Sequence, residues 1–200
     1  MPSVTKSMGF TSSQAQLLTI PPYFAGAASA VIFGKLSDRF MWRLPFIIIP
    51  LIFIVAGFST ILPLAPSITK HVAPCYVGVV IICLGIYPTN PAGSAWISGN
   101  LAGPSKKAMG IALNICMGNL GGIVGSYIFL QEEAPGYPTG FGTGLAVVAS
   151  AIISSLILEY SYWSLNKKRE AMDRSTVLNT YSEDDLQRLG DASPLFRYTL

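Results

Sequence analysis

The fold is decided by a stretch of ten residues, Gly34-Lys35-Leu36-Ser37-Asp38-Arg39-Phe40-Met41-Trp42-Arg43, which places charge between two long windows that contain none. No Asp, Glu, Lys or Arg occurs in residues 7–34 or in residues 44–69. A helix needs roughly 20 apolar residues to cross the hydrocarbon layer of a membrane, so each window is long enough to span it. The charged stretch is therefore predicted to be the water-exposed turn of a membrane hairpin.

The composition is that of a protein that crosses the membrane several times. Of the 200 residues, 12% are charged and 51% are hydrophobic, whereas soluble domains carry about 25% charged residues. The net charge of +3 comes from basic residues clustered beside apolar windows, which indicates membrane topology and argues against a nucleic-acid partner. No metal site, disulfide framework or cofactor is predicted, because the three cysteines lie in apolar windows without CxxC spacing and are interpreted as core residues: Cys75, Cys83 and Cys116.

The chain is predicted to be an all-α membrane protein with a bundle over residues 16–166. Residues 1–15 form an exterior lead-in, and residues 167–200 form a cytoplasmic polar tail with a short helix over 183–189, capped by Ser182 and stopped by Gly190. Lys- and Arg-rich loops stay on the cytoplasmic side, and the basic clusters follow every second span, so the N-terminus is expected outside and the C-terminus inside. The five predicted spans are residues 16–36, 44–63, 73–96, 108–130 and 142–165.

Small residues predict which spans pack against other helices. Gly26, Ala30 and Gly34 recur every four residues in the first span, a pattern that lets a neighbouring helix approach closely. The second span has little polarity on any side, which favours contact with lipid. Near backbone contact is predicted for the fourth span from its glycines, which include Gly118, Gly121, Gly122 and Gly125.

Polar residues inside the third and fourth spans predict a cavity wall. In the third span the polar positions recur at gaps that keep them on one helical face, and Pro88 and Pro91 remove two backbone donors. Such irregularity is tolerated only where protein or a water-filled cavity supplies partners. Asn114 and Asn119 lie in the middle of the fourth span, where each amide needs a partner on another helix or in a cavity.

Three further residues leave alternatives open. His71 is read as a solvated loop residue, with a proton relay as the alternative. Glu159 is read as an interfacial carboxylate, with a proton carrier as the alternative. Trp96 is expected at the cytoplasmic interface, with stacking on a heteroaromatic substrate as the alternative.

Five motifs together resemble a known family of transporters. Residues 34–39 (GKLSDR) resemble the cytoplasmic loop signature of the major facilitator superfamily. With residues 85–91 (GIYPTNP), 96–103 (WISGNLAG), 118–123 (GNLGGI) and 190–198 (GDASPLFRY), they resemble the fungal anion:cation symporter family, the relatives of the allantoate, nicotinate, pantothenate and biotin permeases. The resemblance covers nearly the whole chain.

The resemblance implies a proton-coupled importer of a small organic anion or vitamin-like solute that works by alternating access in the plasma membrane. The five spans would correspond to the last five of twelve helices, so the chain is interpreted as a C-terminal fragment whose partner surface is the missing N-terminal half. No span centre holds an acid or a cation, so proton and anion sites would lie in that half. The substrate-facing residues implied are Tyr87, Asn90, Asn114 and Asn119, with helix-to-helix hydrogen bonding as the alternative for each.

The same resemblance implies a conformational latch formed by Gly34, Asp38 and Arg39 rather than a binding site there. The alternative function is a non-transporting membrane protein that associates with a full-length permease. No paired Asp, His cluster or nucleophile elbow occurs, so an enzyme with catalytic residues is not expected.

Overall fold

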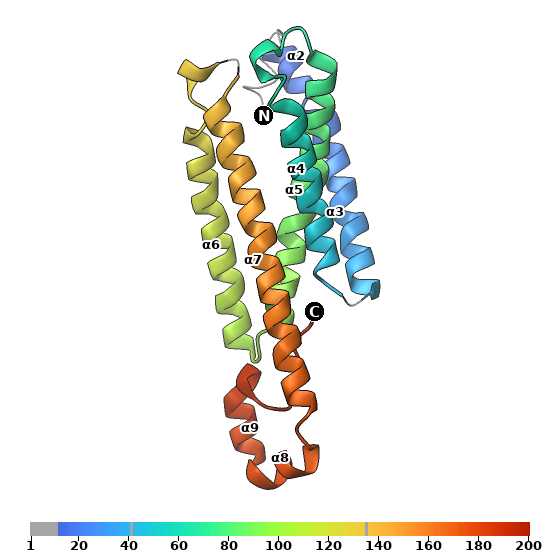
Figure 1. Ribbon diagram of the computed structural model, residues 1–200, viewed down its shortest axis with the longest axis vertical. Coiled ribbons are helices and arrows are strands. Elements are labelled where there is room, and N and C mark those ends of the chain that lie inside the picture. Colours follow the sequence, from blue (N-terminus) through green and yellow to red (C-terminus); the bar gives the residue numbers. More distant parts are fainter. Residues whose placement is uncertain (1–11, 41, 135) are drawn as a thin grey trace.

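A computed structural model describes residues 12–40, 42–134 and 136–200, and within these ranges it contains helices and no strand. Figure 1 shows the long helices side by side, with two short helices near the C-terminus, α8 and α9, beyond one end of the bundle. The α-helices are α2 (Ser12–Leu17), α3 (Ile20–Phe40), α4 (Pro45–Ile61), α5 (Val72–Gly99), α6 (Pro104–Tyr127), α7 (Pro138–Glu170), α8 (Arg174–Thr180) and α9 (Glu183–Leu189). Three 3₁₀ turns cover Ala65–Ser67, Gln131–Glu133 and Gly190–Ala192.

Each of the five predicted spans coincides with a helix. Four segments are long and apolar enough to cross a membrane: Ser13–Phe40, Val72–Gly99, Pro104–Tyr127 and Pro138–Glu170. The remaining helix, α4, is apolar but only 17 residues long. At 1.5 Å per residue it covers about 26 Å, a little less than the hydrocarbon layer of about 30 Å. That all five helices cross the membrane, and in which orientation, stays a prediction.

Most of the charged stretch is helical, because residues 34–40 belong to α3. Helix α3 continues to Phe40, so the water-exposed turn is shorter than predicted and α4 begins at Pro45. Pro45 lies in the first turn of α4, where a missing backbone donor is tolerated.

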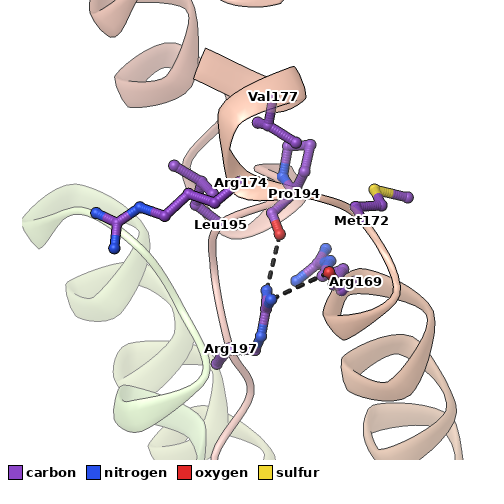
Figure 2. A pocket seen from close by; sticks show the side chains of 7 residues that line it. All are labelled: Arg169, Met172, Arg174, Val177, Pro194, Leu195 and Arg197. Carbon is purple, nitrogen blue, oxygen red and sulfur yellow. Dashed lines mark hydrogen bonds between the residues drawn. The ribbon is translucent and has the colours of Figure 1, made fainter.

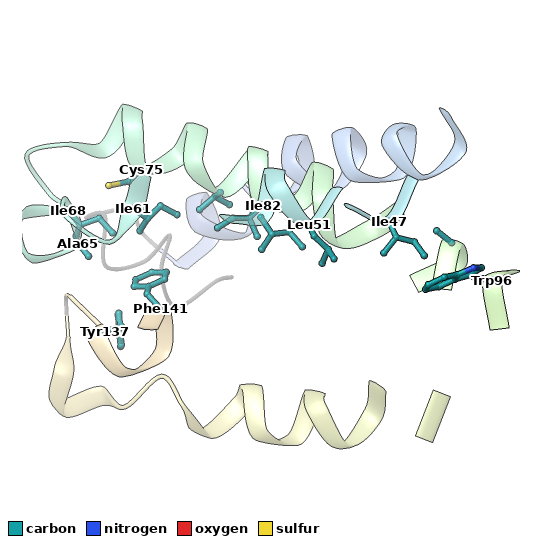
Figure 3. Packing of buried hydrophobic residues seen from close by; sticks show 13 residues of the cluster. Ile47, Leu51, Ile61, Ala65, Ile68, Cys75, Ile82, Trp96, Tyr137 and Phe141 are labelled. Atoms are coloured by element: carbon teal, nitrogen blue, oxygen red, sulfur yellow. The ribbon is translucent and has the colours of Figure 1, made fainter. Parts of the chain in front are cut away.

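The core of the bundle lies between α4, α5 and α7, and it corrects the prediction that the second span faces lipid. Ile47, Leu51, Ile54 and Ile61 of α4 are all buried. They pack with residues of α5 and with Phe141 of α7 (Figure 3). The prediction was wrong because a helix that is apolar on every side carries no pattern that tells a protein-facing side from a lipid-facing side.

Glycines allow α4 and α5 to touch backbone to backbone. A Cβ atom added to Gly57 would lie 2.8 Å from the carbonyl oxygen of Gly78, and one added to Gly78 would lie 2.7 Å from Cγ1 of Ile61. Both distances are shorter than a Cβ atom can approach another heavy atom, so any residue larger than glycine would push the two helices apart. This small-residue contact is made by the second and third spans, for which the sequence did not predict it.

Helix α5 runs without interruption through Pro88 and Pro91. The proline at 88 has no N–H for the carbonyl of Leu84 four residues earlier. Ser29 of α3 is buried and its hydroxyl donates to that oxygen at 2.7 Å. The neighbouring helix α3 therefore supplies the hydrogen bond that the Leu84 carbonyl lacks. The sequence had predicted that either protein or a water-filled cavity would do so.

Candidate functional site

Tyr87 of α5 lies against α3. Its ring covers the backbone of Gly26 so closely that a Cβ atom there would clash with it, and the ring also meets Tyr23 edge-on at 6.2 Å between centroids. Gly26 is buried, as its packing role predicts. Gly34, by contrast, has open space where a Cβ would be, so the small-residue stripe of α3 is in close contact only in part.

The two asparagines of α6 differ in their surroundings. The Asn114 amide donates to the hydroxyl of Ser94 on α5 at 3.0 Å, which is the helix-to-helix alternative. Asn119 is exposed and makes no hydrogen bond to any described residue, and the same is true of Asn90 on α5. Two of the four predicted substrate-facing residues, Tyr87 and Asn114, therefore join helices, and two face outward.

Helix α6 is open along its glycines. None of its residues is buried, and nothing in the described chain lies within 4 Å of a Cβ atom placed on Gly118, Gly121, Gly122 or Gly125. The predicted close helix contact is therefore not made within residues 12–40, 42–134 and 136–200. The glycines leave a face of α6 without side-chain bulk, on which another helix could pack closely.

The predicted latch residues lie at the end of α3. Asp38 forms a salt bridge of 2.7 Å with Arg43, and the same guanidinium donates to the hydroxyl of Ser37 at 2.9 Å. Arg39 is exposed and forms no bond with the described residues. The backbone N–H of Arg43 donates to the main-chain oxygen of Leu200, so this end of α3 meets the C-terminal segment.

Residues 193–200 fold back between α5 and α7 as an irregular segment, which is not a β-strand and is here named the tail strand. The side-chain amide of Asn100 donates to the carbonyl of Thr199 at 3.1 Å, and its oxygen accepts the N–H of Thr199 at 2.7 Å. Asn166 of α7 does the same with Tyr198, with both bonds at 2.8 Å. Two asparagine side chains thus each bind the N–H and the C=O of one residue, and these two residues are successive in the tail strand.

Aromatic rings cover the tail strand. The ring of Tyr198 stacks on that of Tyr162, with centroids 4.5 Å apart and planes 11° from parallel. The indole N–H of Trp96 donates to the carbonyl of Thr199 at 3.0 Å, and Trp96 is only 6% exposed. Trp96 is therefore a buried anchor for the tail strand, a contact that the sequence did not predict, while its place at the cytoplasmic interface stays a prediction.

Charged groups close the tail strand at its start. Lys106, at the beginning of α6, forms a salt bridge of 2.7 Å with Asp191, and this hydrogen bond holds the pKa of Asp191 below its usual value. Arg169 donates to the carbonyl oxygens of Phe196 and Asp191, each at 2.9 Å. This docking was not predicted from the sequence, because single Asn and Arg residues at helix ends form no periodic pattern. The one signal was the resemblance of residues 190–198 to the C-terminal tail of a transporter family.

The remaining candidates have local roles in the structure. His71 is exposed beside α5, with Nδ1 3.1 Å from the hydroxyl of Ser67, which fits a loop residue. Glu159 accepts the indole N–H of Trp42 at 3.0 Å, while its Oε2 is buried without a partner. Cys75 and Cys83 are buried as expected, but Cys116 is exposed. Among the described residues, no three His, Cys, Asp or Glu side chains gather where a metal ion could bind.

A helical bundle with four segments fit to cross a membrane and polar amides on an open face defines the class of multi-pass membrane proteins. Sequence relatives narrow the class to transporters. The chain is 31% identical, over its full length, to the MFS-type transporter cnsO of Penicillium expansum. It is 33% identical to the high-affinity nicotinic acid transporter of Saccharomyces cerevisiae over 99% of its length, and 29% identical to a transporter of Schizosaccharomyces pombe.

The chain spans 39%, 36% and 38% of these three relatives. It is thus homologous to MFS-type membrane transporters along its whole length, while it corresponds to less than half of theirs. The relatives are transporters and not enzymes. No family model matches the chain, and no solved structure matches it.

Proposed function

We propose that this chain forms part of a transporter that moves a small organic anion or vitamin-like solute across the plasma membrane by alternating access. The observation that carries the proposal is full-length similarity to MFS-type transporters, one of which is named for nicotinic acid. The proposal places the N-terminus outside, the C-terminus in the cytoplasm, and proton coupling in the complete protein, as the resemblance to the anion:cation symporters implies.

Asn90 and Asn119 are proposed to face the solute. Both amides are exposed at positions within apolar helices, where a polar group without a partner is costly, and neither bonds to the described chain. Tyr87 and Asn114 are proposed to line the same region while they hold α5 to α3 and α6. Asp38, paired with Arg43, and Arg39 are proposed to form a conformational latch on the cytoplasmic side. In this latch the exposed guanidinium of Arg39 would bind a segment beyond the described residues.

A missing half is proposed to cover α6. The chain matches only 36–39% of its relatives, and the four glycines of α6 leave space for close helix contact. The cover would be the N-terminal helices of the same transporter, which would also bring the proton-accepting carboxylate and the cation that binds the anion.

The test is uptake of labelled nicotinate by proteoliposomes that contain the chain together with its N-terminal helices, with and without an inward proton gradient. Asn90→Ala and Asn119→Ala should each lower uptake, because a lost hydrogen bond to a bound solute costs about 1–3 kcal/mol. Ser150→Ala, a change at an exposed position of α7 whose hydroxyl bonds only within its own helix, is the matched control. Uptake that does not differ from empty liposomes for any organic anion would refute the transport proposal.

The second candidate is a non-transporting membrane protein that pairs with a full-length permease. The open face of α6 favours it, because a fragment with that face needs a partner. Co-purification of the tagged chain with an intact permease, lost on Gly121→Leu and Gly122→Leu, would support this candidate. A stable solitary monomer in detergent would exclude it.

A further inference from the structure

A hollow of about 300 Å³ lies where the end of α7, the start of α8 and the tail strand meet. Three arginines are among its lining residues and define what is here called the arginine pocket: Arg169, Arg174 and Arg197. Figure 2 shows Arg169 and Arg197 close together and the guanidinium of Arg174 pointing away from them. The other lining residues are Met172, Val177, Pro194 and Leu195, so no carboxylate lines the pocket.

None of the three guanidinium groups is neutralised by a described carboxylate. Arg197 donates to the carbonyl oxygens of Pro194 at 2.8 Å and Arg169 at 3.1 Å. Arg169 donates to the carbonyl oxygens of Phe196 in the tail strand and of Asp191 just before it. Arg174 makes no hydrogen bond or ion pair within the described part of the chain. The like charges of Arg169 and Arg197 repel each other, and a bound anion would offset that repulsion.

The nearby acidic groups are already engaged or point elsewhere. Asp173 accepts hydrogen bonds from the hydroxyls of Ser175 and Thr176 in the first turn of α8. Asp191 is bound by Lys106, and Glu170 is exposed and does not line the pocket. Asp173 keeps its negative charge, but none of these carboxylates forms an ion pair with an arginine of the pocket.

An interfacial tryptophan and lysine precede the pocket along α7. Trp163 is exposed near the end of the apolar part of α7, with the ammonium of Lys167 5.0 Å from the centre of its ring, which is typical of the membrane–water interface. Arg169 follows six residues later, about 9 Å further along the helix. That distance places the pocket in the polar layer outside the hydrocarbon, where phosphate groups are found.

We propose that the arginine pocket binds the phosphate groups of an anionic lipid headgroup, with a phosphoinositide as the lipid that fits best. Arginine binds phosphate oxygens through two parallel N–H groups, and a basic pocket at the cytoplasmic ends of membrane helices suits a headgroup that carries several phosphates. Because Arg169 and Arg197 also hold the tail strand, a bound phosphate would stabilise its docked position. The proposal rests on the membrane placement of α7 and on the cytoplasmic C-terminus of the proposed function, but not on transport.

The test uses the purified chain in detergent micelles and measures binding of a fluorescent short-chain phosphatidylinositol bisphosphate by anisotropy. Arg174→Gln and Arg197→Gln should each weaken binding roughly fivefold, the effect of about 1 kcal/mol per basic residue near a phosphate surface. Arg174→Gln is the sharper variant, because Arg174 has no bond in the described chain that its loss could break. Arg188→Gln on α9, an exposed arginine outside the pocket, is the matched control and should leave binding unchanged.

Three results would overturn the proposal. Equal losses for Arg174→Gln and Arg188→Gln would show attraction by net charge instead of a site. Equal binding of phosphatidylserine would show that no phosphate cluster is recognised. Binding of soluble inositol trisphosphate as tight as that of the lipid would make the ligand a soluble phosphate and not a headgroup.

Discussion

Replacement of Asn166 by alanine should release the tail strand. The Asn166 side chain makes two hydrogen bonds of 2.8 Å, one to the N–H and one to the carbonyl of Tyr198. Each such bond contributes about 0.5–1.5 kcal/mol net, so Asn166→Ala should destabilise the docked strand by about 1–3 kcal/mol. Since 1.4 kcal/mol is a factor of ten, the undocked population should rise roughly 5- to 150-fold.

Hydrogen–deuterium exchange of the Tyr198 and Thr199 amides measures this population directly. Both N–H groups are bound by asparagine oxygens in the docked strand, and they exchange only when the strand leaves. Thr199 should exchange faster in Asn166→Ala even though its own partner, Asn100, is intact, because adjacent residues of one strand are released together.

The control for this prediction is Asn179→Ala on α8. Asn179 is exposed and forms no hydrogen bond with the described residues, so the substitution should leave exchange at Tyr198 and Thr199 unchanged. If Asn166→Ala also leaves both amides protected as in the parent protein, the asparagine bonds do not hold the strand and the argument fails.

Three other predictions concern packing, backbone satisfaction and charge. Gly57→Val should destabilise the bundle by about 1–3 kcal/mol or prevent its folding, because the added atoms overlap α5; thermal unfolding in detergent measures it, with Gly142→Val, which meets open space, as the control. Ser29→Ala should cost about 1–3 kcal/mol by the same measurement, since the freed carbonyl of Leu84 would be buried without a donor, and a loss no larger than that of Ser150→Ala would contradict this. The pKa of Asp191 is lowered mainly by the hydrogen bond from Lys106, so its stabilisation of the docked tail is present above the carboxyl's usual pKa and is lost as pH falls through the lowered value. Tail exchange followed through that acidic range should show this loss, and a pH response that persists in Asp191→Asn would refute it.

The short helix in the tail shows how far local signals reach. Helix α9 spans Glu183–Leu189, with a capping box between Ser182 and Asp185 and a positive φ of 58° at Gly190, in agreement with the sequence prediction. Every contact involved lies within a few residues, so the pattern can be recognised in the sequence. The same holds for the apolar helices, whose length and lack of charge follow from bilayer thickness.

The side of a helix that packs is a different kind of information. Helix α4 was predicted to face lipid, yet it forms the centre of the core, because Gly57, Gly78 and Gly85 let α5 approach it. A run of Ile, Leu and Phe is equally compatible with lipid and with protein. Only the fit of facing surfaces distinguishes the two.

The sequence by itself determined that this chain is a bundle of membrane-length helices related to transporters, since charge-free windows and their basic borders are properties of consecutive residues. The tertiary structure alone decided what the isolated polar residues do. Asn100 and Asn166 are 66 positions apart and bind the main chain of two adjacent residues, Thr199 and Tyr198. A pairing across such a separation depends on how α5, α7 and the tail meet in space, and no local pattern encodes it.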